Sequence, residues 1–245
     1  SHGNNLHSGS NRSHYQFYNT IFGGEPDGDY VEFSRTSPHL EQGFPGNLQQ
    51  IIRYTLTEKN ELRISYCMKS DKATVINPTN HSYFNLGGDV LGHVMEVYSD
   101  SFLLTDANLL PTGEIASVEG TPMDFRKAHT VGERIGEDYE PLKLAGGYDH
   151  NYILPNDKKL KKVAKIVCPE TGITMEVETD RCGMQVYSGN FLNGKHGKDG
   201  AVYRKRAGIC FETQFYPNSC KQPGFPSCIF KGGEEMKSTT VYRFI

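Results

Sequence analysis

The feature that most constrains the fold of this chain is a series of short alternating apolar runs that end at glycine, proline or polar turns. Residues 47–56 and 61–67 form two such runs, joined by the polar stretch Glu58-Lys59-Asn60. Alternation with a period of two is typical of a strand with one buried face, and two adjacent runs predict a β-hairpin. Residues 162–168 and 173–178 predict a second hairpin, which turns at Pro169-Glu170-Thr171-Gly172.

The rest of the chain continues this pattern. We predict further strands at residues 15–22, 30–35, 94–98, 185–188, 208–213 and 239–244, and a single helical turn at 130–135. The 26 glycines and 12 prolines interrupt these runs at short intervals, as an antiparallel sandwich requires. We find no repeat and no change of composition that would indicate a linker. The sequence therefore predicts one all-β domain over residues 1–245.

Composition and charge exclude several classes of protein. A net charge of −3 gives no electrostatic reason to expect a nucleic-acid or membrane-surface partner. No apolar segment is long enough to cross a membrane, and the first residues lack the basic and apolar regions of a signal peptide. The six cysteines have no zinc-ligand spacing, so we expect reduced, mostly buried thiols in a cytoplasmic protein without a metal. Cys220 and Cys228 are the one pair to watch for a disulfide.

The run Asn77-Pro78-Thr79-Asn80-His81-Ser82-Tyr83-Phe84-Asn85-Leu86-Gly87-Gly88 is the strongest candidate for a functional motif. It follows the apolar run 73–76, so His81 would stand just beyond a strand among side-chain amides and hydroxyls. An imidazole in such surroundings suits recognition of a polar ligand, and it can exchange protons near neutral pH. The alternative is a hydrogen-bonded histidine in a turn.

Three more segments occur with this motif in an informative order. They are Asn4-Asn5-Leu6-His7-Ser8-Gly9, then Gly146-Gly147-Tyr148-Asp149-His150-Asn151-Tyr152, then Phe211-Glu212-Thr213-Gln214-Phe215-Tyr216-Pro217. Together the four segments resemble the aldose 1-epimerase (galactose mutarotase) family, and the resemblance extends from about Asn4 to Phe244. It implies a large antiparallel two-layer β-sandwich of the galactose mutarotase-like kind, with a sugar site on one concave face.

The resemblance implies an aldose 1-epimerase that interconverts the α and β anomers of a hexose such as galactose or glucose. The reaction needs a base for the anomeric hydroxyl and an acid for the ring oxygen, but no cofactor and no metal. Glu212 would be the base and His81 the acid, on opposite sides of the sugar ring. Alternation places Glu212 on the same strand face as Cys210 and Gln214, and apolar surroundings would raise its pKa. From composition alone, Glu212 could equally be a charged residue on the outer face of an edge strand.

The resemblance also implies four substrate-binding residues: His7, Asn80, Asp149 and Gln185. Each has a plainer alternative. His7 could belong with His2 and His14 to a set of terminal, tag-like histidines, Asp149 could cap a turn, and Gln185 could be an ordinary strand surface residue. The expected partner is a monosaccharide.

The family's opening strands, which include an arginine that contacts the sugar, have no counterpart before Asn4. We therefore expect a domain that is N-terminally truncated relative to the family, with weakened sugar binding and self-association through an open sheet edge. An impaired or non-catalytic carbohydrate-binding protein on the same scaffold is the second hypothesis. A glycoside hydrolase would have to use Glu212 and Asp149 as its two carboxylates. A sugar-phosphate epimerase lacks clustered Lys and Arg beside the motifs.

Overall fold

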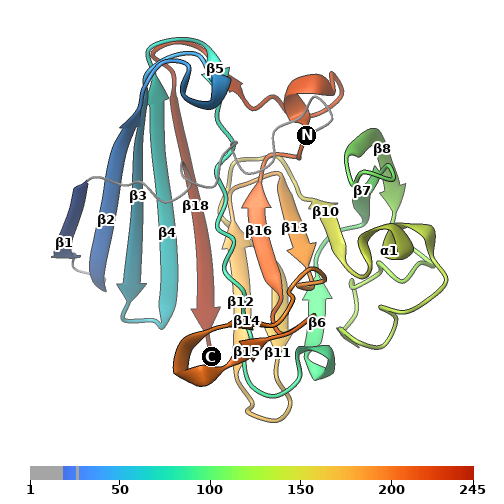
Figure 1. Cartoon of the computed structure of the whole chain (residues 1–245). Coiled ribbons are helices and arrows are strands. Elements are labelled where there is room, and N and C mark those ends of the chain that lie inside the picture. Colours follow the sequence, from blue (N-terminus) through green and yellow to red (C-terminus); the bar gives the residue numbers. More distant parts are fainter. Residues whose placement is uncertain (1–18, 26–27) are drawn as a thin grey trace.

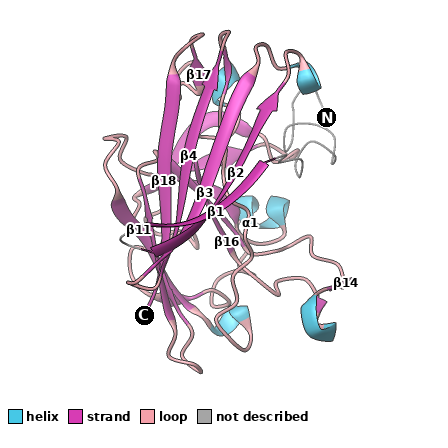
Figure 2. Cartoon of the chain, turned by 90° about the vertical axis from the view of Figure 1, so that its left-hand side faces the viewer, coloured by secondary structure: helices cyan, strands magenta, loops and turns pink. Residues whose placement is uncertain are grey.

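Two antiparallel sheets contain most of the strands (Figure 1). The computed structural model describes residues 19–25 and 28–245. In Figure 2 the strands β1, β2, β3, β4 and β18 stand in front, and β16 of the other sheet lies behind them. The predicted fold class, an all-β sandwich with antiparallel sheets, is confirmed.

The larger sheet has nine strands. In spatial order they are β1 (Asn19–Glu25), β2 (Gly28–Ser37), β3 (Leu48–Thr57), β4 (Glu61–Ser70), β18 (Glu235–Phe244), β12 (Thr174–Thr179), β11 (Lys161–Val167), β6 (Val94–Val97) and β9 (His129–Thr130). Both predicted hairpins are present, because β3 pairs with β4 and β11 pairs with β12, each time antiparallel. The last strand of the chain, β18, pairs with β4 on one side and β12 on the other, and so joins the two hairpins.

The smaller sheet has five strands and forms the base of the candidate site. In spatial order they are β16 (Cys210–Gln214), β13 (Gly183–Tyr187), β10 (Asp149–Ile153), β7 (Ser101–Thr105) and β8 (Pro111–Ser117). Two minor ladders join β17 (Ile229–Phe230) to β5 (Thr74–Val75) and β14 (Lys195–His196) to β15 (Val202–Tyr203). Sequence reasoning missed β7, β8 and β10.

Helical structure is short in the described ranges 19–25 and 28–245. The α-helix is α1 (Glu140–Ala145), and the 3-10 turns span Glu41–Gly43, Val90–Gly92, Lys198–Gly200 and Ser219–Lys221. The predicted helical turn at 130–135 was wrong, since residues 131–135 form turns after the two-residue strand β9. No helix within the described ranges combines the length and apolar character needed to cross a membrane.

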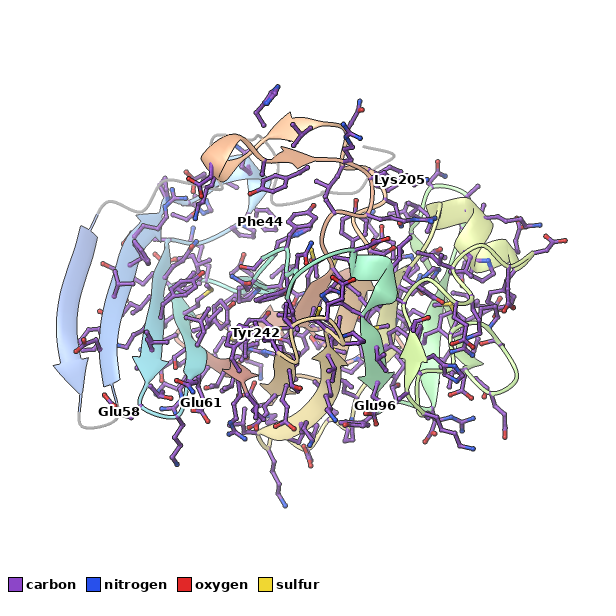
Figure 3. The ribbon with its side chains drawn as sticks, turned by 90° about the horizontal axis from the view of Figure 1, so that it is seen from below. Phe44, Glu58, Glu61, Glu96, Lys205 and Tyr242 are labelled. Carbon is purple, nitrogen blue, oxygen red and sulfur yellow. The ribbon has the colours of Figure 1, made fainter. Side chains whose placement is uncertain are left out.

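The core lies between the two sheets. Phe211 of β16 and Tyr242 of β18 are both fully buried, and the Tyr242 hydroxyl donates to the Phe211 carbonyl at 2.7 Å. Figure 3 shows Tyr242 near the middle of the molecule. Because strand side chains alternate, Phe211 facing this core turns Cys210, Glu212 and Gln214 to the opposite face of the smaller sheet. The predicted shared face of these three residues is thus present.

All six cysteines lie in the described part of the chain and all are free thiols. Four are buried, whereas Cys67 is half-buried and Cys220 is exposed. The structure does not join Cys220 to Cys228, and most of the thiols are buried, as expected.

Candidate active site

The segment that carries His81 runs along the free edge of β16. At one end the Asn77 side chain bonds the Phe215 backbone twice, donating to its carbonyl at 3.1 Å and accepting from its N–H at 2.9 Å. At the other end Phe84 exchanges backbone hydrogen bonds of 2.8 and 2.9 Å with Ile209. Because both ends are fixed to β16, His81 is held beside that strand.

The register of the smaller sheet assembles the other candidates on one face. Gln185 of β13 lies opposite Glu212 of β16, and Asp149 of β10 lies opposite Tyr187 of β13. Residues directly opposite each other in an antiparallel pair share a face, as do residues two apart in a strand. Asp149, Gln185 and Glu212 therefore share the face that turns away from the core.

His81 and Glu212 are in contact, with His81 Nε2 3.6 Å from Glu212 Oε1. The His81 side chain is 34% exposed and that of Glu212 10% exposed, so the pair lies at the boundary between the sheet and solvent. We had expected the two groups on opposite sides of a sugar ring. The structure instead puts them side by side, which is the arrangement that two neighbouring oxygen atoms of one substrate would require.

Burial, together with the nearby carboxylate of Asp149, raises the pKa of Glu212 to about 8. Burial also raises the pKa of Asp149, against the opposing effect of a hydrogen bond from Gln185. The negative charge of Asp149 thus adds to burial in opposing ionisation of Glu212. Glu212 can therefore exchange a proton near neutral pH rather than near its usual pKa of 4.5.

Gln185 lies opposite Glu212 in the sheet and bonds to Asp149. Its Nε2 donates to Asp149 Oδ1 at 2.7 Å, whereas its Oε1 is buried and has no hydrogen-bond partner among the described residues. Buried polar atoms are nearly always hydrogen-bonded, so an acceptor without a donor at this position suits a ligand hydroxyl. The interpretation of Gln185 as an ordinary surface residue loses support, because this side chain is neither well exposed nor fully satisfied.

A glycine positions Asp149. Gly147 has φ +145°, and a Cβ there would lie 2.3 Å from Oδ1 of Asn190. The Asn190 amide in turn donates to the carbonyls of Ala145 and Tyr148 at 3.0 Å each. The turn before β10 thus closes only with glycine at position 147, which explains the glycine pair of the motif.

Sequence reasoning missed two neighbours of His81. Cys210 Sγ lies 3.5 Å from His81 Nδ1, and the Tyr83 ring lies against the imidazole with centroids 5.1 Å apart. Alternation had placed Cys210 on the face of Glu212, so a signal for it existed. Tyr83 is 45% exposed, so it is not the core residue that an aromatic near a strand usually is.

The remaining predicted residues are placed differently. Asn80 Oδ1 accepts from the Ser82 N–H at 3.1 Å, and its amide donates to the Tyr54 hydroxyl at 3.4 Å, so these two bonds tie Asn80 to its own loop and to the larger sheet. His7 lies outside the described residues. The structure therefore brings together His81, Asp149, Gln185 and Glu212 from three strands and one edge segment.

A sequence model of the aldose 1-epimerase family matches residues 1–243. The chain belongs to the aldose 1-epimerase family. It is 42% identical over 219 residues to a galactose mutarotase from Sus scrofa. The aligned region covers 87% of this chain and 62% of that protein. It is 37% identical over 221 residues to an aldose 1-epimerase from Escherichia coli K12, covering 88% of this chain and 64% of that protein. The chain thus spans less than two thirds of the length of these family members.

Solved structures of the family agree with the fold. The structure of a galactose 1-epimerase from Lactobacillus acidophilus NCFM superposes with a TM-score of 0.87 at 27% identity, covering 98% of this chain and 70% of that one. The resemblance inferred from the four sequence segments is confirmed, and with it the sandwich architecture.

Proposed function

We propose that this protein is an aldose 1-epimerase that interconverts the α and β anomers of a hexose such as galactose or glucose. The observation that carries the proposal is the contact between the His81 imidazole and the Glu212 carboxyl group at 3.6 Å, beside Asp149 and Gln185 on the same sheet face. The names of its family members, galactose mutarotase and aldose 1-epimerase, support the same reaction.

In the proposed mechanism Glu212 acts as the base and His81 as the acid. Glu212 takes the proton from the anomeric hydroxyl while His81 gives a proton to the ring oxygen, and the bond between C1 and that oxygen breaks. Both oxygens are bonded to the same carbon, so an acid and a base in mutual contact can reach them together. Rotation about the C1–C2 bond then presents the other face of the aldehyde. The reverse proton transfers close the ring, so that each residue regains its starting state.

Asp149 and Gln185 would bind the sugar hydroxyls. A carboxylate offers acceptors on both oxygens, and Gln185 Oε1 is an acceptor that still lacks a donor among the described residues. We keep Asn80 and His7 as proposed binding residues as well. For Asn80 the role requires that its amide exchange the 3.4 Å contact with Tyr54 for a sugar hydroxyl.

Polarimetry tests this proposal directly. Freshly dissolved α-galactose and α-glucose should approach their equilibrium rotation faster with the protein than without it. Treatment with EDTA should not lower the rate, because neither proton transfer requires a metal or another cofactor. A rate equal to the spontaneous background with both sugars would rule out the proposed activity.

A carbohydrate-binding protein without catalytic activity is the second candidate. Binding of galactose, measured by calorimetry, together with a background rate of mutarotation would favour it. The presence of both an acid and a base in contact supports the enzyme, since binding alone needs neither.

Two further proposals concern the whole protein. We expect it to act in the cytoplasm, where its free thiols would stay reduced. We also expect self-association through an open sheet edge, for which β1 is the candidate because it pairs with β2 at one end of the nine-strand order. Sedimentation at several protein concentrations tests this expectation, and a constant monomer mass would contradict it.

A further inference from the structure

Three side chains of different chemistry meet at the acid–base pair. His81, Cys210 and Glu212 each offer one metal-ligating atom, and these three atoms lie within 4.8 Å of one another. The mutarotation mechanism uses the imidazole and the carboxylate but gives no role to the thiol. A nitrogen, a sulfur and an oxygen ligand on one side of a solvent-facing site are the donor types that zinc accepts.

The distances are close to those of a zinc site. In a tetrahedral centre with Zn–S near 2.3 Å and Zn–N near 2.0 Å, the sulfur and nitrogen lie about 3.5 Å apart. Cys210 Sγ is 3.5 Å from His81 Nδ1, and Glu212 Oε1 is 3.6 Å from His81 Nε2. Cys210 lies near Nδ1 of the ring and Glu212 near Nε2, whereas a single ion would bind only one of these nitrogens. The imidazole would therefore have to rotate slightly when the ion binds. His81 is 34% exposed and lies in an edge segment, which leaves room for that rotation.

A cation would bind here in place of protons. Zinc coordinates the deprotonated forms of a thiol and a carboxyl group, so its binding would release the protons of Cys210 and Glu212. A divalent ion bound to a thiolate, a carboxylate and a neutral imidazole would neutralise the two ligand charges. Three protein ligands leave a fourth position for water or a sugar oxygen.

We propose that His81, Cys210 and Glu212 form an inhibitory site for a thiophilic divalent cation, with Zn²⁺ as the expected ion. The bound ion would occupy the lone pairs of both the acid and the base, and it would stand where the anomeric oxygens approach. Binding of the ion is independent of the reaction, whereas the inhibition rests on the proposed mutarotase activity. Mg²⁺, which prefers an all-oxygen octahedral shell, should not bind there.

Cobalt provides a readout that needs no activity. Metal-free protein titrated with Co²⁺ should develop a thiolate-to-cobalt charge-transfer absorption, and Zn²⁺ should remove it by displacement. Cys210→Ser should abolish the absorption, and His81→Asn should weaken Co²⁺ binding at least about tenfold. Cys220→Ser and Cys67→Ser are matched controls that should keep it. Histidines near the N-terminus contain no thiol, so they cannot produce this signal.

Inhibition is the second readout. Zn²⁺ should slow mutarotation by the wild-type protein, and Mg²⁺ at the same concentration should not. In Cys210→Ser the Zn²⁺ concentration for half-inhibition, relative to that variant's own rate, should rise at least about tenfold. Saturating galactose should raise the Zn²⁺ concentration for half-inhibition of the wild-type protein, because sugar and ion compete.

The possible results separate the two proposals. A cobalt–thiolate absorption that depends on Cys210, in a protein with no mutarotation, would sustain the metal site and refute the enzymatic function. Mutarotation that is insensitive to Zn²⁺, with no such absorption, would sustain the enzyme and overturn the metal site. An absorption that survives Cys210→Ser but disappears in Cys67→Ser or Cys220→Ser would also overturn it.

Discussion

Two glutamates of this fold are almost equally buried, Glu61 at 3% exposure and Glu212 at 8%, yet their carboxyl groups behave in opposite ways. Glu61 opens β4, and Figure 3 places it at the end of the β3–β4 hairpin near Glu58. Arg243 of β18 contacts it at 2.6 Å and Arg63 at 3.2 Å. Burial disfavours ionisation of Glu61, but these arginines outweigh it, so its pKa lies below its usual value.

Glu212 is buried next to another carboxyl group and an imidazole, and its pKa is raised to about 8. Burial disfavours ionisation of both glutamates, and the neighbours decide the outcome. The arginines beside Glu61 outweigh burial and produce a structural ion pair, whereas at Glu212 burial dominates and the nearby Asp149 adds to it, so that Glu212 exchanges protons near neutral pH.

The largest expected difference between the two glutamates is in catalysis. Glu212→Gln should slow mutarotation by roughly two to four orders of magnitude, because the amide keeps the shape but cannot accept the proton. Glu61→Gln is the matched control, and its rate should stay within a few-fold of the wild type. Polarimetry corrected for the spontaneous rate measures both.

His81→Asn should give a loss comparable to that of Glu212→Gln, through the missing acid. Near-normal rates in both His81→Asn and Glu212→Gln would leave only the carbohydrate-binding function.

The next largest difference is in stability. Glu61→Gln should lower the free energy of unfolding by about 1–3 kcal/mol, because it removes charge-assisted hydrogen bonds to partly buried Arg243. Glu212→Gln should cause no such loss at pH 7. Urea denaturation of the two variants side by side makes the comparison, and equal destabilisation by both would contradict it.

A smaller effect concerns the pH dependence of activity. Since the proposed base must be deprotonated, the rising limb of kcat/KM against pH, measured with EDTA present, should have its inflection near pH 8, and the falling limb should report loss of the proton from the acid. Asp149→Asn should move that inflection to lower pH, because it removes the nearby negative charge. An inflection that stays in place in Asp149→Asn would show that burial alone sets the Glu212 pKa.

The smallest effect is the pH dependence of stability. A carboxyl group whose pKa is raised in the folded protein binds its proton more tightly there, so stability is lost as pH rises between about 4.5 and 8. The side-chain amide in the Glu212→Gln variant cannot ionise. The variant should therefore be more stable than the wild type by about 1 kcal/mol or more at pH 9, and the gap should close towards pH 4.5. Thermal unfolding across this range tests the sign.

Much of the fold was predictable because hairpins are local. Residues 48–70 contain both strands and the turn of β3–β4, so the local pattern is enough to predict their pairing. The short strand β10 was missed, since a glycine pair and an aspartate suggested a loop. The helix α1 was missed too, although Pro141 in its first turn and Gly146 after its end, with φ 68°, are recognised start and stop signals.

The candidate site was predictable only in part, because its contacts join distant residues. The alternating pattern predicted which face of its strand carries Glu212. The family resemblance predicted which residues would belong to the site. Neither could show that Cys210 meets His81, 129 positions away, or that Arg243 pairs with Glu61, 182 positions away. Glu61 begins one alternating run and Glu212 lies inside another, and only the tertiary structure shows that Glu61 meets an arginine and Glu212 a carboxylate.

The attachment of the His81 segment to β16 has a consequence for folding. The two hydrogen bonds of Asn77 to Phe215 span 138 positions of the chain. Contacts of such long range form only after the intervening chain has closed a large loop, and folds dominated by them form slowly. His81 and Glu212 can therefore meet only after the His81 segment has docked on β16. During refolding, recovered mutarotation would report the completed sandwich, whereas the local β3–β4 hairpin can form well before it.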